Sequence, residues 1–226
     1  GCVFDEVYRI YRVDLIAHVR THHRPLSDLA FLSALPDAIT VQDLRALLDE
    51  QQDLDPDLER LCRQYLPLSF SRRHGDPSRP WNFFSIDLRA EDGSVKRGFQ
   101  GNWRALFQNW EALGRSFPAF AEGMVATFLT ASTADGYNPY RISHNGIDWE
   151  VIEPDDEWSY IGYWGDHQLI YLLHLLELVH EHEPERLSKR LNARLFTYAN
   201  VPYRICSYAA LLADPRDTIS YDHAEH

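Results

Sequence analysis

The stretch Tyr160-Ile-Gly-Tyr-Trp-Gly-Asp-His-Gln168, followed by Leu169-Ile-Tyr-Leu-Leu-His-Leu-Leu-Glu-Leu-Val179, joins a polar, aromatic segment to an apolar run. The leucine-rich run predicts a long, mostly buried helix over 164–180. Pro184 then favours the start of a partner helix over 185–198, which makes an antiparallel helical hairpin. We therefore expect a mainly α fold built from antiparallel helical hairpins.

A second helical hairpin is expected upstream of the first. Residues 102–114 carry apolar side chains at the i, i+3, i+4, i+7 spacing of an amphipathic helix. Gly114 and Pro118 separate this helix from another over 119–129. Shorter helices are expected at 3–18, 26–35, 41–49, 55–64 and 203–212. Small β-hairpins are expected in the connections, with strands at 83–90 and 95–100 around a Gly-containing turn, and over 141–152 around Asn145-Gly146.

These patterns divide the chain into three parts. Residues 1–68 form a helical connecting or packing segment. Residues 69–213 hold the two clear hairpins and the polar, aromatic loops, and residues 214–226 form a polar tail that is expected to fray. The chain opens at Gly1 rather than Met, so we expect it to be part of a longer protein.

Composition limits the classes of partner. A formal charge of −12 disfavours nucleic acid and anionic membrane surfaces, because both need clustered Lys and Arg. No apolar run reaches the roughly 18 residues of a membrane span. Cys2, Cys62 and Cys206 are far apart and lack a CxxC spacing, which favours a reduced, cytoplasmic compartment. No cofactor is expected.

The loops at 71–82, 100–104 and 137–168 are rich in Trp, Tyr, carboxylates and amides. Such loops predict a concave sugar site, because aromatic rings stack on the C–H faces of sugars while carboxylates and amides bind hydroxyls. The predicted substrate-binding residues are Arg72, Arg73, His74, Asp76, Trp81, Asn82, Gln100, Asn102, Trp103, Arg104, Asn138, Tyr140, Arg141, Trp149, Trp158, Tyr163, Trp164, His167 and Gln168.

Several of these residues have a second interpretation. The predicted arginines either bind the ligand or form ion pairs with the surplus carboxylates of the chain. Trp103 and Trp110 lie seven residues apart on one helix face, which favours the core over a stacking platform. His174, within the leucine run, is expected in the core or at its boundary. His18, His22 and His23 favour a solvated helix end over a metal cluster, and no metal site is predicted.

Three carboxylates are candidates for catalysis. Inverting glycoside hydrolysis uses two carboxyl groups about 6.5–9.5 Å apart, one protonated and one ionised. Asp166, at the first turn of the apolar helix, has the aromatic surround that raises an acid's pKa, although it is equally suited to cap that helix. Asp148 and Glu150 flank Trp149 in an expected strand, so both side chains face one side. A solvated hairpin is the alternative there.

Three stretches together are similar to one family: Ser71-Arg-Arg-His-Gly-Asp-Pro-Ser-Arg-Pro-Trp-Asn82, Gln100-Gly-Asn-Trp-Arg104 with Phe107-Gln-Asn-Trp-Glu111, and Tyr160 to Gln168. Over about residues 65–200 the chain resembles the six-hairpin, or (α/α)6-toroid, glycosidase-like superfamily. Within it, the likeness is to large bacterial proteins compared with glycogen-debranching and glucoamylase-type enzymes. The resemblance implies part of a toroid, completed by the remaining hairpins of a longer chain, around an oligo- or polysaccharide.

Two functions follow from the resemblance. Most members cleave or phosphorolyse glycosidic bonds with inversion, which implies a glycoside hydrolase-like domain fragment with Asp166 and either Glu150 or Asp148 as its two carboxylates. The alternative is a non-catalytic saccharide-binding or structural module. It rests on two departures. Several relatives carry an Arg-Asp pair after an aromatic residue, whereas Trp103-Arg104 is followed by Ala105, and a full toroid needs six hairpins, of which two are clear in this chain.

Overall fold

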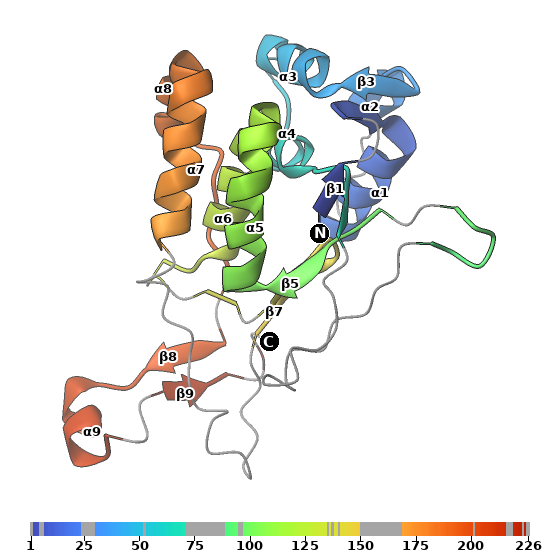
Figure 1. The fold of residues 1–226 in the computed structure, drawn as a ribbon. Helices are drawn as coiled ribbons and strands as arrows, with labels where there is room; N and C mark the ends of the chain where they lie inside the picture. The colour runs from blue at the N-terminus through green and yellow to red at the C-terminus, as the bar shows by residue number, and fades with distance from the viewer. Residues whose placement is uncertain are drawn as a thin grey trace.

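The computed structural model of the chain describes residues 2–4, 7–23, 30–51, 53–70, 89–94, 97–134, 136, 138–139, 141–149, 169–200, 202–215, 219–222 and 224. Over these residues the fold is mainly helical with small antiparallel sheets, which confirms the predicted class (Figure 1). The described helices are α1 (Arg12–His22), α2 (Ala30–Ala34), α3 (Val41–Glu50), α4 (Pro56–Gln64), α5 (Trp103–Ser116), α6 (Ala121–Ala131), α7 (Leu169–His182), α8 (Pro184–Leu191) and α9 (Tyr208–Ala213), with a 3-10 turn η1 at Pro118–Phe120.

The described strands are three residues long and pair antiparallel. The two-stranded pairs are β1 (Cys2–Phe4) with β4 (Leu68–Phe70), β2 (Arg9–Tyr11) with β3 (Ala38–Thr40), and β8 (Tyr203–Ile205) with β9 (Ile219–Tyr221). A three-stranded sheet has the order β5 (Gln100–Asn102), β6 (Arg141–Ser143), β7 (Gly146–Asp148). The β6–β7 hairpin forms where Asn145-Gly146 predicted one, but its two turn residues are His144 and Asn145, and Gly146, with a φ of 145°, begins β7.

Helix α7 is less buried than its leucine-rich sequence predicts: Leu175, Leu178 and Val179 are buried, whereas Leu169, Ile170 and Leu173 are exposed. It packs against α5, α6 and α8, and Figure 1 shows α5, α6 and α7 side by side. Glu183 alone joins α7 to α8, where Pro184 occupies the first helical turn. On the N-terminal side of the bundle, Thr40 and Asp55 cap α3 and α4 by accepting hydrogen bonds from backbone N–H groups of the first turn.

One core cluster draws on both halves of the chain. Leu15 of α1 and Leu61 of α4 belong to the same buried cluster as Phe107 of α5 and Leu175 of α7. Its aromatic centre contains Trp103 and Trp110, each at most 1% exposed, which is the interpretation that their helical spacing favours. The Trp103, Phe107 and Phe128 rings meet at centroid separations of 4.7–4.8 Å, within the range of favourable aromatic pairs.

Buried ion pairs tie α3 and α4 to α6 and α8. Glu122 of α6 has its side chain 7% exposed and lies 2.7 Å from Arg190 Nε and 3.3 Å from Arg45 Nε. The Oδ1 atom of Asp49 lies 2.6 Å from Arg63 Nη2 and 2.7 Å from Arg190 Nη2. Burial disfavours the Asp49 carboxylate, but hydrogen bonding and attraction from these arginines dominate and lower its pKa.

The structure differs from the sequence predictions at both ends of the chain. In place of a helix over 3–18, two short strands precede α1, and Val7 turns between them with a φ of 59°. In place of a helix over 203–212, β8 precedes α9, and the tail that was expected to fray supplies β9. The predicted 185–198 helix ends at Leu191. In each strand, pairing with a distant segment outweighs local helix propensity. No helix in the described ranges is long and apolar enough to cross a bilayer.

Candidate functional site

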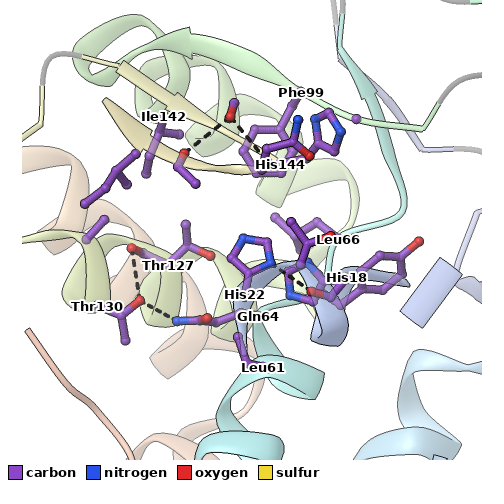
Figure 2. Close-up of a pocket in the computed structure, with 18 of the residues that line it drawn as sticks. His18, His22, Leu61, Gln64, Leu66, Phe99, Thr127, Thr130, Ile142 and His144 are labelled. Carbon is purple, nitrogen blue, oxygen red and sulfur yellow. Dashed lines mark hydrogen bonds between the residues drawn. The ribbon is translucent and has the colours of Figure 1, made fainter. Parts of the chain in front are cut away.

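A pocket of about 430 Å³ lies between α1, α4, α6 and the β6–β7 hairpin (Figure 2). We call it the histidine pocket, because His18 and His22 of α1 and His144 of the β6–β7 turn line it. Gln64 of α4 and Thr127 and Thr130 of α6 supply further polar side chains to its walls. Phe99, Leu61, Leu66 and Ile142 supply the apolar part of the lining.

His18 is held neutral. It is half-buried, its Nε2 atom is inaccessible to solvent, and that atom has no hydrogen-bond partner among the described residues. Burial lowers the pKa of His18 to about 3, and repulsion from His22 adds to the shift. The His18 ring lies 4.3 Å from the His22 ring and 5.3 Å from the Tyr65 ring, measured between centroids. His18 is therefore an uncharged part of the wall at physiological pH.

His22 and His144 are exposed and stand on opposite walls of the pocket (Figure 2). His22 Nδ1 lies 2.8 Å from the His18 carbonyl oxygen, which fixes its ring. Desolvation lowers the pKa of His22, and repulsion from His144 and Arg60 adds to the effect. Over the described residues, no group of three or more His, Cys, Asp or Glu side chains has the arrangement of a metal site.

The position of His144 depends on a glycine. A Cβ atom on Gly98 would lie 2.7 Å from His144 Nδ1, so any other residue there would displace the imidazole from this rotamer. The backbone N–H of His144 donates to the Phe99 carbonyl at 2.9 Å, which ties the turn to the chain entering β5. Strand pairing and this hydrogen bond together hold the backbone of His144 beside the pocket.

The fixed charges around the pocket are paired. Arg97 donates to Asp14 and stacks over the Tyr11 ring at 4.9 Å. Arg60 donates to Asp57 at 2.8 Å. Asp14 is the only carboxylate among the described lining residues. The described walls therefore offer hydrogen-bonding groups and apolar surface, with little uncompensated charge.

The polar side chains on the α4–α6 side are ordered by hydrogen bonds. Gln64 donates to Thr130 Oγ1 and to the Ala126 carbonyl, the latter at 3.2 Å. Thr127 Oγ1 donates to the Gly123 carbonyl at 2.9 Å. Each hydroxyl oxygen can still accept a hydrogen bond. This combination of fixed hydroxyl and amide groups beside an apolar surface suits a polyhydroxylated ligand.

Most of the predicted site residues fall outside the described residues. These are Arg72, Arg73, His74, Asp76, Trp81, Asn82, Tyr140, Glu150, Trp158, Tyr163, Trp164, Asp166, His167 and Gln168. Five more are described in their backbone only: Asp148, Gln100, Asn102, Arg104 and Arg141. The backbone of Asp148 pairs with that of Arg141 and directly follows Ile147, which lines the histidine pocket.

Three predicted binding residues are described with their side chains, and all three are buried. Trp103 lies in the main core. Asn138 is 3% exposed, and its Nδ2 donates to Ser132 Oγ at 3.2 Å. Trp149 packs in a separate small cluster with Tyr221. None of the three lines the histidine pocket.

The sequence interpretation missed the histidine pocket. Its signals were weak: His18 and His22 at the i, i+4 spacing of one helix face, and His144 next to the turn-forming Asn145-Gly146. His22 is solvated as expected for a helix end, but His18 lies against the pocket wall. Nothing in the sequence indicates that α1 and the β6–β7 turn face each other, because about 120 residues separate them.

Comparison with known families identifies one similarity. Residues 4–67 match the family model described as glycoside hydrolase family 149 insertion domain 1. The match covers less than a third of the chain, from β1 to the residue before β4. None of the curated proteins compared with the chain matches it. The match supports a module related to glycoside hydrolases, and the matched segment contributes the α1 and α4 walls of the histidine pocket.

Proposed function

We propose that this chain is a carbohydrate-directed module of a glycoside hydrolase-related protein, and that the histidine pocket is its saccharide-binding site. One observation carries the proposal: the segment similar to a glycoside hydrolase insertion domain forms one side of a pocket lined by hydroxyl, amide, imidazole and apolar groups. Apolar surface beside oriented polar groups matches the two faces of a sugar ring. The single described carboxylate of the lining, Asp14, is engaged by Arg97, which favours binding over catalysis in this pocket.

The test is a binding titration on the whole chain. Isothermal titration calorimetry and NMR should detect binding of gluco-oligosaccharides to the chain. Both α-linked and β-linked series are tested. Replacing exposed Asn145, at the pocket rim, by Ala should weaken binding about fivefold by removing one amide hydrogen bond. Gln42→Ala, on the exposed face of α3, is the matched control and should leave the affinity unchanged. Absence of binding to every saccharide would contradict the proposal.

The second candidate is an inverting hydrolase that uses Asp166 with Glu150 or Asp148. The position of Asp148 favours it, because β7 runs from the pocket lining directly into Asp148-Trp-Glu150. In this hypothesis the pocket holds part of the substrate beside the carboxylates. Reducing-sugar release from gluco-oligosaccharides tests it: Asp166→Asn and Glu150→Gln should each abolish release, whereas release that survives both changes would reject these carboxylates.

We further propose that α5 to α8 are hairpins of an α/α toroid that the remaining hairpins of a longer chain complete, with an oligo- or polysaccharide as partner. The packing of α7 against α5, α6 and α8 supports this arrangement. A structure of the full protein tests it, since six hairpins in a ring are expected. A reduced, cytoplasmic setting is proposed as well, and the free thiols of Cys62 and Cys206 support it. The expected result is that all three cysteines of protein isolated from the cytosol react with a thiol reagent after unfolding, since Cys62 is buried in the folded chain.

A further inference from the structure

Two ionisable side chains face the cavity of the histidine pocket from opposite walls. His22 reaches it from α1, and His144 reaches it from the β6–β7 turn on the opposite wall (Figure 2). Both side chains are exposed, so a ligand in the pocket can contact either ring. An imidazole is neutral and can accept a hydrogen bond above its pKa, whereas below it both nitrogens donate and the ring is positive.

The other titratable and charged groups of the described lining are paired or buried. On α1, Asp14 is paired with Arg97, and His18 is kept neutral by burial. On α4, Arg60 is paired with Asp57. The remaining one, Tyr65, follows α4 and is buried. His22 and His144 are thus the exposed imidazoles of the described lining.

We propose that His22 and His144 make the ligand choice of the histidine pocket depend on pH: neutral saccharides bind at neutral pH, and carboxylate-bearing saccharides are favoured once both imidazoles are protonated. This inference rests on the proposed saccharide site. At neutral pH an anionic sugar must be desolvated without gaining a cationic partner, which disfavours it. After protonation, two imidazolium groups from opposite walls can each donate a charge-assisted hydrogen bond to one carboxylate. The lowered pKa of His22 places the change on the acid side of pH 6.5.

Two sugar probes that differ in one charged group test the effect of ligand charge on binding. Methyl β-D-glucopyranoside and methyl β-D-glucuronide differ only in a hydroxymethyl group against a carboxylate, and the carboxylate is ionised throughout the range. Both are titrated by NMR against the whole chain at about pH 7.5 and at the lowest pH, near 5, where the near-UV circular dichroism still equals that at pH 7.5. EDTA is present throughout, so that no metal ion bridges the imidazoles and the sugar.

The expected result is a change in the affinity ratio. The ratio of glucuronide to glucoside affinity should rise about tenfold from the higher to the lower pH in the wild-type chain. His22→Gln and His144→Gln, which keep a polar side chain but cannot become positive, should each reduce this rise, and the double variant should abolish it. His180→Gln, at an exposed histidine of α7 outside the pocket, should behave like the wild type.

Two results would overturn the inference: an affinity ratio that is equal at both pH values, or a rise that persists in the double variant. These outcomes leave the saccharide site intact, since either probe still binds. If neither these probes nor gluco-oligosaccharides bind at any pH, the proposed function fails as well. The two failures are therefore distinguishable.

Discussion

At the scale of single residues, Glu122 has the most buried carboxylate of the ion-pair network between α3, α4, α6 and α8. Arg45 and Arg63 on one side, and Arg186 and Arg190 on the other, lie within 3.8 Å of its oxygens. Desolvation lowers the pKa of Arg45, while attraction to Glu122 opposes this shift and favours the guanidinium. Removing these charges from water costs free energy when the network forms. Once it has formed, replacing one charged side chain leaves its buried partners without a compensating charge.

Glu122→Gln should therefore destabilise the protein by about 3 kcal/mol, because Gln keeps the shape but not the charge. Urea unfolding monitored by circular dichroism gives the free energy of unfolding. Glu177→Gln, at an exposed position of α7, is the control and should change it by less than about 0.5 kcal/mol. Equal stabilities of the Glu122 variant and the wild type would show that the arginines find other partners.

His18 predicts a specific pH dependence of stability. Its folded-state pKa is about 3, below the ordinary value of 6.5, so the unfolded chain binds the proton more tightly than the folded one. The stabilisation is fully present above pH 6.5 and is lost progressively as the pH falls toward 3. Between pH 7 and pH 5 this residue should account for a loss of about 2 kcal/mol in unfolding free energy.

His18→Gln should remove that part of the pH dependence, and urea unfolding at several pH values measures it. His180→Gln should retain the wild-type slope, since this histidine is exposed on α7. A wild-type stability that does not fall between pH 7 and pH 5 would mean that His18 is protonated without loss in the folded state.

At the scale of elements, the approach of α6 to α4 depends on Gly123. A Cβ atom at this position would lie 2.6 Å from the backbone carbonyl oxygen of Arg63. A backbone atom cannot rotate aside, so the helices would have to separate. Gly114 on α5 presents a contrasting case, because its Cβ would meet the end of the Leu178 side chain, which can adopt another rotamer.

Gly123→Ala should lower the free energy of unfolding by about 1–3 kcal/mol through overpacking. Gly114→Ala is the matched control, where the gain in helix propensity of about 1 kcal/mol offsets the shift of Leu178. Thermal and urea unfolding compare the two variants. If Gly123→Ala is the more stable of the pair, α4 and α6 do not approach as closely as the 2.6 Å contact requires.

At the scale of the molecule, residues 1–68 and the helices α5 to α7 share one hydrophobic core. Leu48, Leu61 and Leu68 are at most 2% exposed within the cluster that contains Trp103 and Leu178. Separating the chain at the predicted boundary after residue 68 would expose apolar surface on both pieces. Burial of such surface supplies most of the stabilisation of a domain of this size.

Residues 1–68 and 69–226, produced separately, should therefore each lack a cooperative thermal transition, whereas the intact chain should melt cooperatively. Differential scanning calorimetry of the two pieces, alone and mixed, measures this. The mixture should regain a transition if the pieces dock through the shared core. Independent melting of either piece would instead establish it as a separate domain.

The amino-acid sequence determined the features that depend on neighbours along the chain. The apolar spacing of residues 102–114, the Gly114 and Pro118 pair, the leucine run after Gln168 and the first-turn proline Pro184 predicted α5 to α8 and hence the mainly helical class. Asn145-Gly146 predicted a hairpin at the position of β6 and β7, although the turn itself is made by His144 and Asn145. Helical spacing also favoured the core for Trp103 and Trp110. These signals act within a few residues, so they can be read without knowing the fold.

Only the tertiary structure decided the strand pairs at both ends and the histidine pocket. β1 with β4 and β8 with β9 form because segments far apart in sequence meet, and that pairing overrides local helix propensity. His18 and His144 share a cavity because α1 packs beside α4 and the β6–β7 turn bends over them. A side chain's burial, its pKa and its neighbours across the pocket depend on such long-range packing, and no local pattern encodes them.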